Sequence, residues 1–176
     1  MRARTGGTEA TSRALRALVT VLAFALSPCA GEAEVGEEAG MIDELLHWIG
    51  KRGGLEVDTV RAAPPRILIA DVGEWLGSDK GGFEVAVDWA GAWDPELGAI
   101  VLVWPWSAGD LFDRSVLLHE LVHAVQSANG RNLCDPLAER EAYSLQARWL
   151  AERGTGLLVD WEAVRRRSAC TAESGP

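Results

Sequence analysis

The chain has 176 residues, of which 26 are acidic and 17 are basic, and its formal net charge is −9. The first thirty residues hold four arginines and one glutamate, a net charge of +3, so the rest of the chain carries −12. Such an acidic chain repels polyanions, which argues against nucleic acids and anionic membranes as partners. Composition does not fix an oligomeric state.

The N-terminal thirty residues have the three-part pattern of a secretory signal. Four arginines precede the apolar stretch Ala17–Leu26, which is followed by Ser27-Pro28-Cys29-Ala30-Gly31. This apolar stretch is too short for a helix that spans a bilayer. We therefore expect residues 1–30 to be a signal peptide, and the protein to be periplasmic or secreted without a membrane span. Pro28 stands where a lipoprotein signal needs a small residue, which disfavours a lipid anchor at Cys29.

About 145 residues remain after the signal, enough for one domain and too few for two. Residues 31–40 are rich in glycine and glutamate and are expected to form a flexible acidic lead before a single domain at 41–176. The domain begins with a predicted helix, Met41–Lys51, because its apolar residues recur at helical spacing and Gly53-Gly54 can end it.

Three strands are predicted after this helix: Arg66–Val72, Phe83–Trp89 and Ala99–Trp104. The last two are expected to form a hairpin, because Asp94-Pro95-Glu96-Leu97-Gly98 between them is a turn signal. In such a sheet, an edge strand can bind an extended peptide, although the sequence does not say which strand is the edge. Trp104 and Trp106 are candidates for the lining of a cleft.

Residues 110–126 are predicted to form a helix that carries a metal-binding motif. The segment has no proline or glycine and is followed by Asn129-Gly130, which is typical of a helix C-terminus. It contains His119-Glu120-Leu121-Val122-His123, and the whole chain has three histidines. Residues four apart on a helix differ by about 40° around its axis, so the two imidazoles share one face. This pattern indicates two zinc ligands, with Glu120 beside the metal as a general base.

A catalytic zinc site needs a third protein ligand, and the sequence excludes two familiar choices. A third histidine six residues after His123 is absent, because Asn129 stands there. An aspartate in a Gly-Thr-x-Asp element is absent as well, because Gly154-Thr155 is followed by Gly156-Leu157. A glutamate remains as the third ligand.

Two glutamates are candidates, and both lie on a second predicted helix. Asp135-Pro136 is typical of a helix start, and the helix is expected to run over residues 136–153 and to end at Gly154. Its first turns carry Glu139 and Glu141, which point about 200° apart and so cannot both face one metal ion. The residues alone leave the choice between them open.

The motif at 119–123, taken with Glu139-Arg140-Glu141-Ala142-Tyr143, resembles the gluzincins, which are zinc metallopeptidases with a glutamate ligand on a later helix. In several of those families the ligand begins a Glu-x-x-x-Asp element. The resemblance therefore implies that the metal ligands are His119, His123 and Glu139. Tyr143 replaces the aspartate of that element, so what orients the histidines is left open.

Within 118–150, the segment Leu118–Gln126, Cys134 and the run at 142–150 together resemble small exported bacterial proteins of unknown function, and this resemblance implies no substrate. Cys134 and Cys170 are the only cysteines after the signal, and an even pair in an exported chain favours a disulfide between them. The alternative, a thiolate ligand at Cys134, fits structural zinc sites better than catalytic ones.

These features predict an α+β domain with a minimal zincin-like fold: a small twisted sheet, an N-terminal helix, the H-E-x-x-H helix and a glutamate-bearing helix after it. The expected activity is hydrolysis of a peptide or amide bond in a peptide or protein substrate. Zinc would activate water, and Glu120 would accept its proton. Tyr143, the only tyrosine, is a candidate donor to the oxyanion.

Two alternatives to an enzyme are compatible with the same residues. The motif helix can be a buried structural helix whose histidines are satisfied by neighbouring groups. The protein can also be a non-catalytic exported binding module, with a structural or relic metal site and an acidic, tryptophan-rich surface that binds another protein.

Overall fold

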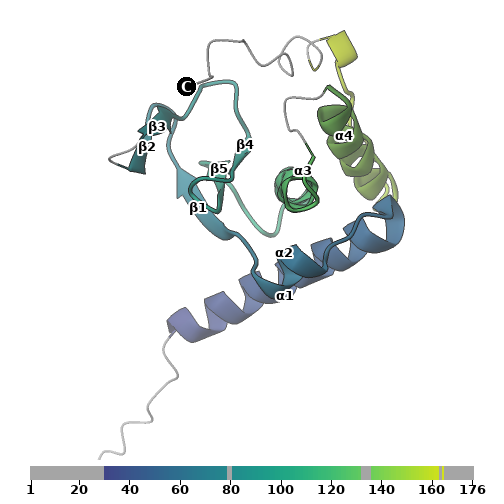
Figure 1. The fold of residues 1–176 in the computed structure, drawn as a ribbon, viewed down its shortest axis with the longest axis horizontal. Helices are drawn as coiled ribbons and strands as arrows, with labels where there is room; N and C mark the ends of the chain where they lie inside the picture. The colour runs from purple at the N-terminus through teal and green to yellow at the C-terminus, as the bar shows by residue number, and fades with distance from the viewer. Residues whose placement is uncertain (1–29, 79–80, 132–135, 163, 165–176) are drawn as a thin grey trace, which may run out of the picture.

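The computed structural model describes residues 30–78, 81–131, 136–162 and 164. Along these residues two helices precede all of the strands and two more follow them, and this segregation of helices from strands confirms the α+β class (Figure 1). In chain order they are α1 (Ala30–Gly53), α2 (Asp58–Ala62), β1 (Arg66–Ala70), β2 (Trp75–Ser78), β3 (Gly81–Glu84), β4 (Gly91–Asp94), β5 (Ala99–Val103), α3 (Leu111–Ala128) and α4 (Pro136–Ala151). Residues 1–29, and with them almost all of the expected signal peptide, lie outside the described residues, as do Cys134 and Cys170.

Helix α1 is longer than the sequence pattern indicated. The predicted apolar face is confirmed, because Ile42, Leu45, Leu46 and Ile49 are all buried. The helix begins at Ala30, however, so residues 31–40, for which we expected a flexible lead, are helical. Alanine and glutamate are strong helix formers, and their frequency in this segment accounts for the extension. The helix ends at Gly53, two residues after the predicted end at Lys51, and Gly54 follows it with a φ of 68°.

The main sheet has three strands in the order β1-β5-β4, with β1 parallel and β4 antiparallel to β5. Strand β5 is buried on both faces: Ile100 and Leu102 pack with the helices, and Val101 packs on the other side with residues of the β2-β3 hairpin. In the described part of the chain, β4 is one edge of this sheet and β1 is the other.

The predicted hairpin exists, but its first strand was wrongly placed. The turn is correct: the Oδ1 atom of Asp94 accepts hydrogen bonds from the backbone N–H groups of Glu96 and Leu97. The strand that pairs with β5 is β4, which begins at Gly91. Of the predicted strand at 83–89, only the first two residues are in a strand, and they pair with β2. Val87 is 83% exposed, so the alternation of apolar residues in this segment does not reflect a sheet face.

Helix α3 is the central element of the fold. Figure 1 shows it end-on, with α1 below it, α4 on one side and the three-stranded sheet on the other, and it contacts all of them as well as α2. Every residue from Ser115 to Gln126 is buried, so the motif helix is enclosed on all sides. The side chain of Asp110 caps its first turn by accepting hydrogen bonds from the N–H groups of Phe112 and Asp113. At its other end, Gly130 has a φ of 72°.

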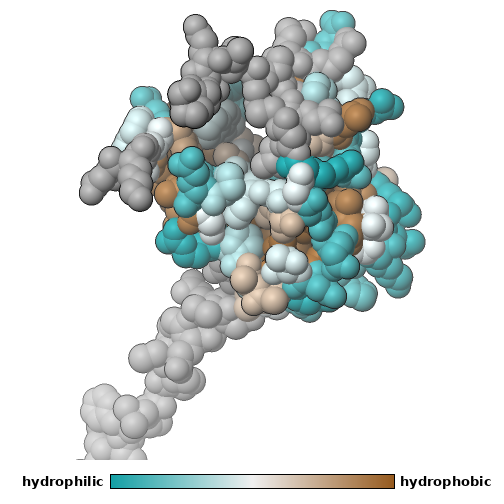
Figure 2. Space-filling view, in the orientation of Figure 1, coloured by the Kyte–Doolittle hydropathy of each residue, from teal (hydrophilic) through white to brown (hydrophobic). Residues whose placement is uncertain are grey.

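Helix α4 runs antiparallel to α3 and begins at the predicted proline. It ends at Ala151, two residues earlier than expected, and Gly154 follows with a φ of 78°. In the described part of the chain, no helix is both long and apolar enough to cross a bilayer. On the face shown in Figure 2, the hydrophobic residues at the surface form separate patches between hydrophilic residues.

Replacing Leu45 by alanine tests the packing of α1. Leu45 is fully buried in the main core, so Leu45→Ala should lower the free energy of unfolding by about 2–5 kcal/mol. The matched control is Leu158→Ala, because Leu158 is fully exposed and its replacement should change stability by less than about 0.5 kcal/mol. Urea unfolding followed by circular dichroism measures both. Equal midpoints for the two variants would contradict the placement of α1.

Candidate metal centre

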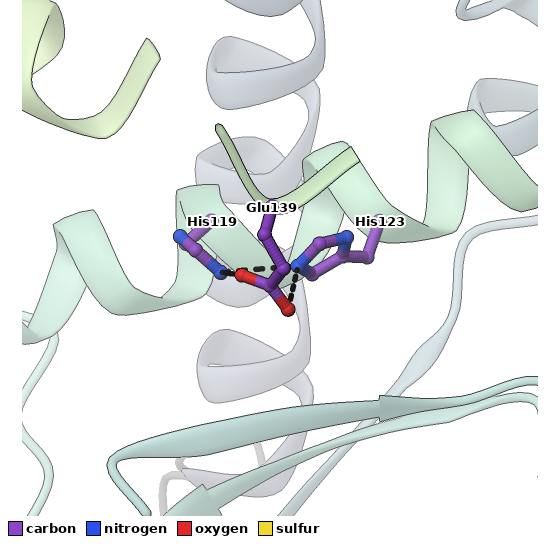
Figure 3. A group of neighbouring side chains, drawn as sticks. All are labelled: His119, His123 and Glu139. Atoms are coloured by element: carbon purple, nitrogen blue, oxygen red, sulfur yellow. Dashed lines mark hydrogen bonds and ion pairs between the residues drawn. The ribbon is translucent and has the colours of Figure 1, made fainter. Parts of the chain in front are cut away.

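Two histidines of α3 and a glutamate of α4 converge on one point (Figure 3). His119 and His123 are buried, and their Nε2 atoms lie 3.0 Å apart. The carboxylate of Glu139 bridges them: Oε2 lies 3.4 Å from Nε2 of His119, and Oε1 lies 3.4 Å from Nε2 of His123. One potential ligand atom from each residue lies within 4.8 Å of the other two. The three predicted ligands thus form a group that could hold a metal ion.

The structure distinguishes between the two candidate glutamates. Glu139 faces the gap between the histidines, whereas Glu141 points to the side of α3 beyond His123. The Oε2 atom of Glu141 accepts a hydrogen bond from Nε2 of Gln126 at 2.9 Å and forms an ion pair with Arg131. Glu141 is therefore engaged by other groups and is not part of the triad.

Glu139 and His123 favour each other's charged forms. Burial alone would raise the pKa of Glu139, but its hydrogen bonds to both histidines and their charges hold that pKa far below its usual range. Burial alone would lower the pKa of His123, but the hydrogen bond to Glu139 and the charges of Glu120 and Glu139 raise it above its ordinary value. A divalent cation can replace the proton as the positive partner of this carboxylate, because metal ligands bind in their deprotonated forms.

Glu120 and Tyr143 lie in the same cleft as the triad. The cleft has a volume of about 400 Å³, and both side chains line it together with the three ligands. Glu120 is buried, and the ring of Tyr143 meets that of His119 edge-on with 4.4 Å between centroids. The two residues expected to act as base and oxyanion donor are therefore beside the candidate metal ligands.

One wall of the cleft is the edge strand β4 with the residues before it, 88–93. The strand approaches α3 so closely that a Cβ atom on Gly91 would lie 3.2 Å from Cγ of Glu120 and 3.0 Å from Cγ1 of Val116. Trp89 and Trp93 also line the cleft, which the sequence did not indicate. The candidates Trp104 and Trp106 do not: Trp104 is largely exposed elsewhere, and Nε1 of Trp106 donates a hydrogen bond to the carbonyl of Asp113.

Polar side chains continue along the α3–α4 interface on both sides of the triad. Nearer the start of α3, Nε2 of Gln146 donates a hydrogen bond to Oγ of Ser115 at 3.0 Å. Nearer its end, Gln126 contacts His123 and two groups of α4. The residues that form this polar seam along α3 are Ser115, His119, His123 and Gln126. Gln126 was missed as a site residue, although a glutamine three positions after His123 in an apolar helix was a usable signal.

Residues 34–175 match a family described as "Domain of unknown function (DUF6647)". The match spans most of the chain and includes every residue of the candidate site, so the chain belongs to this family. No curated protein and no solved structure shows a significant match.

Replacing each glutamate separately tests the identity of the third ligand. Glu139→Gln removes a carboxylate from the triad, so metal affinity should fall by more than about 100-fold. Glu141→Gln should cost no more than the roughly 10–100-fold typical of groups that contact a ligand without binding the metal. Competition with a chromogenic chelator measures both affinities. The assignment is wrong if Glu141→Gln abolishes metal binding while Glu139→Gln retains it.

Proposed function

We propose that this member of the DUF6647 family is a zinc-dependent metallopeptidase or amidase with a zincin-like arrangement of its site. One observation carries the proposal. Two imidazoles and a carboxylate converge on one point, and Glu120, which lies between the two histidines in the sequence, lines the same cleft. A structural metal site has no need of a carboxylate beside it that faces a cleft. The arrangement is what hydrolysis by metal-activated water requires.

The separations of the donor atoms support zinc as the metal. Zinc binds histidine nitrogen and carboxylate oxygen at about 2.0–2.2 Å in tetrahedral geometry, which places pairs of ligand atoms about 3.3 Å apart. The two Nε2 atoms lie 3.0 Å apart, and each lies 3.4 Å from a different carboxylate oxygen of Glu139. One ligand atom from each of the three residues lies within 4.8 Å of the other two. Three protein ligands are also the usual number in catalytic zinc sites, where the fourth position is left for water or substrate.

The residues of the chain divide the reaction between them. Zinc, when bound, lowers the pKa of water and polarises the substrate carbonyl. Glu120 accepts the proton of the attacking water and delivers it to the leaving amine. Tyr143, beside His119, donates a hydrogen bond to the oxygen on which negative charge develops.

The position of β4 supports an extended peptide as the substrate. Residues 90–93 form part of the cleft wall, and β4 is an edge of the sheet in the described residues. A peptide that pairs with this edge by β-augmentation would lie along the cleft. The expected signal at residues 1–30 extends the proposal to a peptidase that acts in the cell envelope or outside the cell.

Removing the carboxylate of Glu120 tests the assigned base. Glu120→Gln should keep the metal, because Glu120 is not in the triad, and should lower kcat/KM by about 10²–10⁴-fold. Hydrolysis of labelled casein and of a library of internally quenched peptides measures the rate, and metal analysis is done on the same sample. The control is Glu96→Gln, which removes an exposed carboxylate from the β4-β5 turn. Activity that survives in Glu120→Gln rejects this base.

Removing the hydroxyl of Tyr143 separates catalysis from packing. If the hydroxyl stabilises the oxyanion, Tyr143→Phe should lower kcat by about 100-fold and leave KM nearly unchanged. Metal affinity should not change, because Tyr143 is not a ligand. Steady-state kinetics on the best peptide of the library decides between the roles. An unchanged kcat means that Tyr143 only packs against His119.

A further inference from the structure

Gln126 contacts His123 on the ring nitrogen that faces away from the other two candidate ligands. It is fully buried near the end of α3, and its Oε1 atom lies 2.9 Å from Nδ1 of His123. The other ring nitrogen of His123, Nε2, faces His119 and Glu139. A neutral imidazole carries one proton, so Nε2 can offer its lone pair to a metal only if that proton is on Nδ1.

The surroundings of Gln126 determine which end of its amide faces His123. Its Nε2 atom lies 3.0 Å from the carbonyl oxygen of Ala138 and 2.9 Å from Oε2 of Glu141. Both of these groups are acceptors, so the NH₂ end of the amide must point to them. The oxygen of the amide is then left for His123, and an oxygen can only accept. His123 must therefore donate from Nδ1.

The same contacts join the two helices that carry the ligands. Ala138 precedes Glu139 in the first turn of α4, and its carbonyl is held by a side chain of α3. Arg131 also forms an ion pair with the carboxylate of Glu141. One glutamine thus contacts both a ligand histidine and the backbone next to the ligand glutamate.

We infer that Gln126 is a positioning residue of the metal centre, with Glu141 as the group that orients it. Gln126 holds His123 in the Nδ1–H tautomer and holds the first turn of α4 against α3, so that both ligands are arranged before the metal binds. This inference rests on the metal centre of the proposed function, but not on the reaction or its substrate. Among the described residues, Nδ1 of His119 is buried without a hydrogen-bond partner, so His119 provides an internal comparison.

The experiment measures the tautomer directly in metal-free protein. Long-range ¹H–¹⁵N NMR at a pH where both imidazoles are neutral should show His123 protonated on Nδ1 in the unchanged chain. In Gln126→Met, which has nearly the same shape but no acceptor oxygen, the Nε2–H form should become populated at His123, while His119 should change little. Zinc affinity should fall by about 10–100-fold.

A double variant, Gln126→Glu with Glu141→Gln, provides a second test if Gln126→Met does not fold. Gln126→Glu alone places a third acceptor against the carboxylate of Glu141 and the carbonyl of Ala138, so zinc affinity should fall by about 10-fold or more. Adding Glu141→Gln to it restores a donor between the two side chains and should recover most of the loss. A variant that is merely less well packed would show no such recovery.

Two results would overturn the inference: an Nε2–H tautomer at His123 in the unchanged chain, or variants whose tautomer and zinc affinity equal those of the unchanged chain. A double variant that fails to recover affinity overturns the role of Glu141. None of these measurements uses a substrate. A chain that binds zinc through an oriented His123 but hydrolyses nothing would therefore reject the proposed function and leave the inference standing.

Discussion

The rest of this structure depends on one requirement: the polar side chains inside the otherwise apolar helix α3 need hydrogen-bond or ion-pair partners. Twelve consecutive residues of α3 are buried, and a histidine, carboxylate or amide in such surroundings is costly unless it has a partner. Helix α4 supplies partners for Ser115, His119, His123 and Gln126 in antiparallel order, whereas Glu120 lines the cleft. Along α3 from Ser115 to Gln126, they are Gln146, Tyr143, Glu139 and then Glu141 with the carbonyl of Ala138. The candidate metal centre is the middle of this seam.

This constraint explains why the fold is arranged around one helix. The seam uses only one side of α3, and the remaining sides are covered by α1, α2 and the sheet through apolar contacts. The ligand positions are therefore held by packing around most of the helix that bears them, except where it lines the cleft. Burial also strengthens the electrostatic coupling between Glu139 and the two imidazoles, since fewer water molecules screen their charges.

The three long helices could be predicted from the sequence, apart from the N-terminal extension of α1, because their signals are local, whereas the short helix α2 was not predicted. A capping aspartate at 110, glycines after each long helix and apolar residues at helical spacing all act within one segment. The strands are short, and β2 and β4 contain glycine and few β-branched residues, so their stability comes from partners distant in sequence. His119 and His123 were identifiable because zinc chemistry fixes their spacing. Helix geometry alone left the choice between Glu139 and Glu141 open, because it depends on how α4 is rotated against α3. The resemblance to gluzincins is what favoured Glu139.

The close approach of Gly91 to Glu120 has a geometric consequence for the proposed peptidase. Because Gly91 has no side chain, the backbone of β4 lies directly against the side chain of Glu120. A peptide paired with a strand can shift only in steps of two residues, about 7 Å, if each side chain is to stay on the same face. Pairing with the edge of β4 would thus place only every second amide bond of a bound chain opposite Glu120.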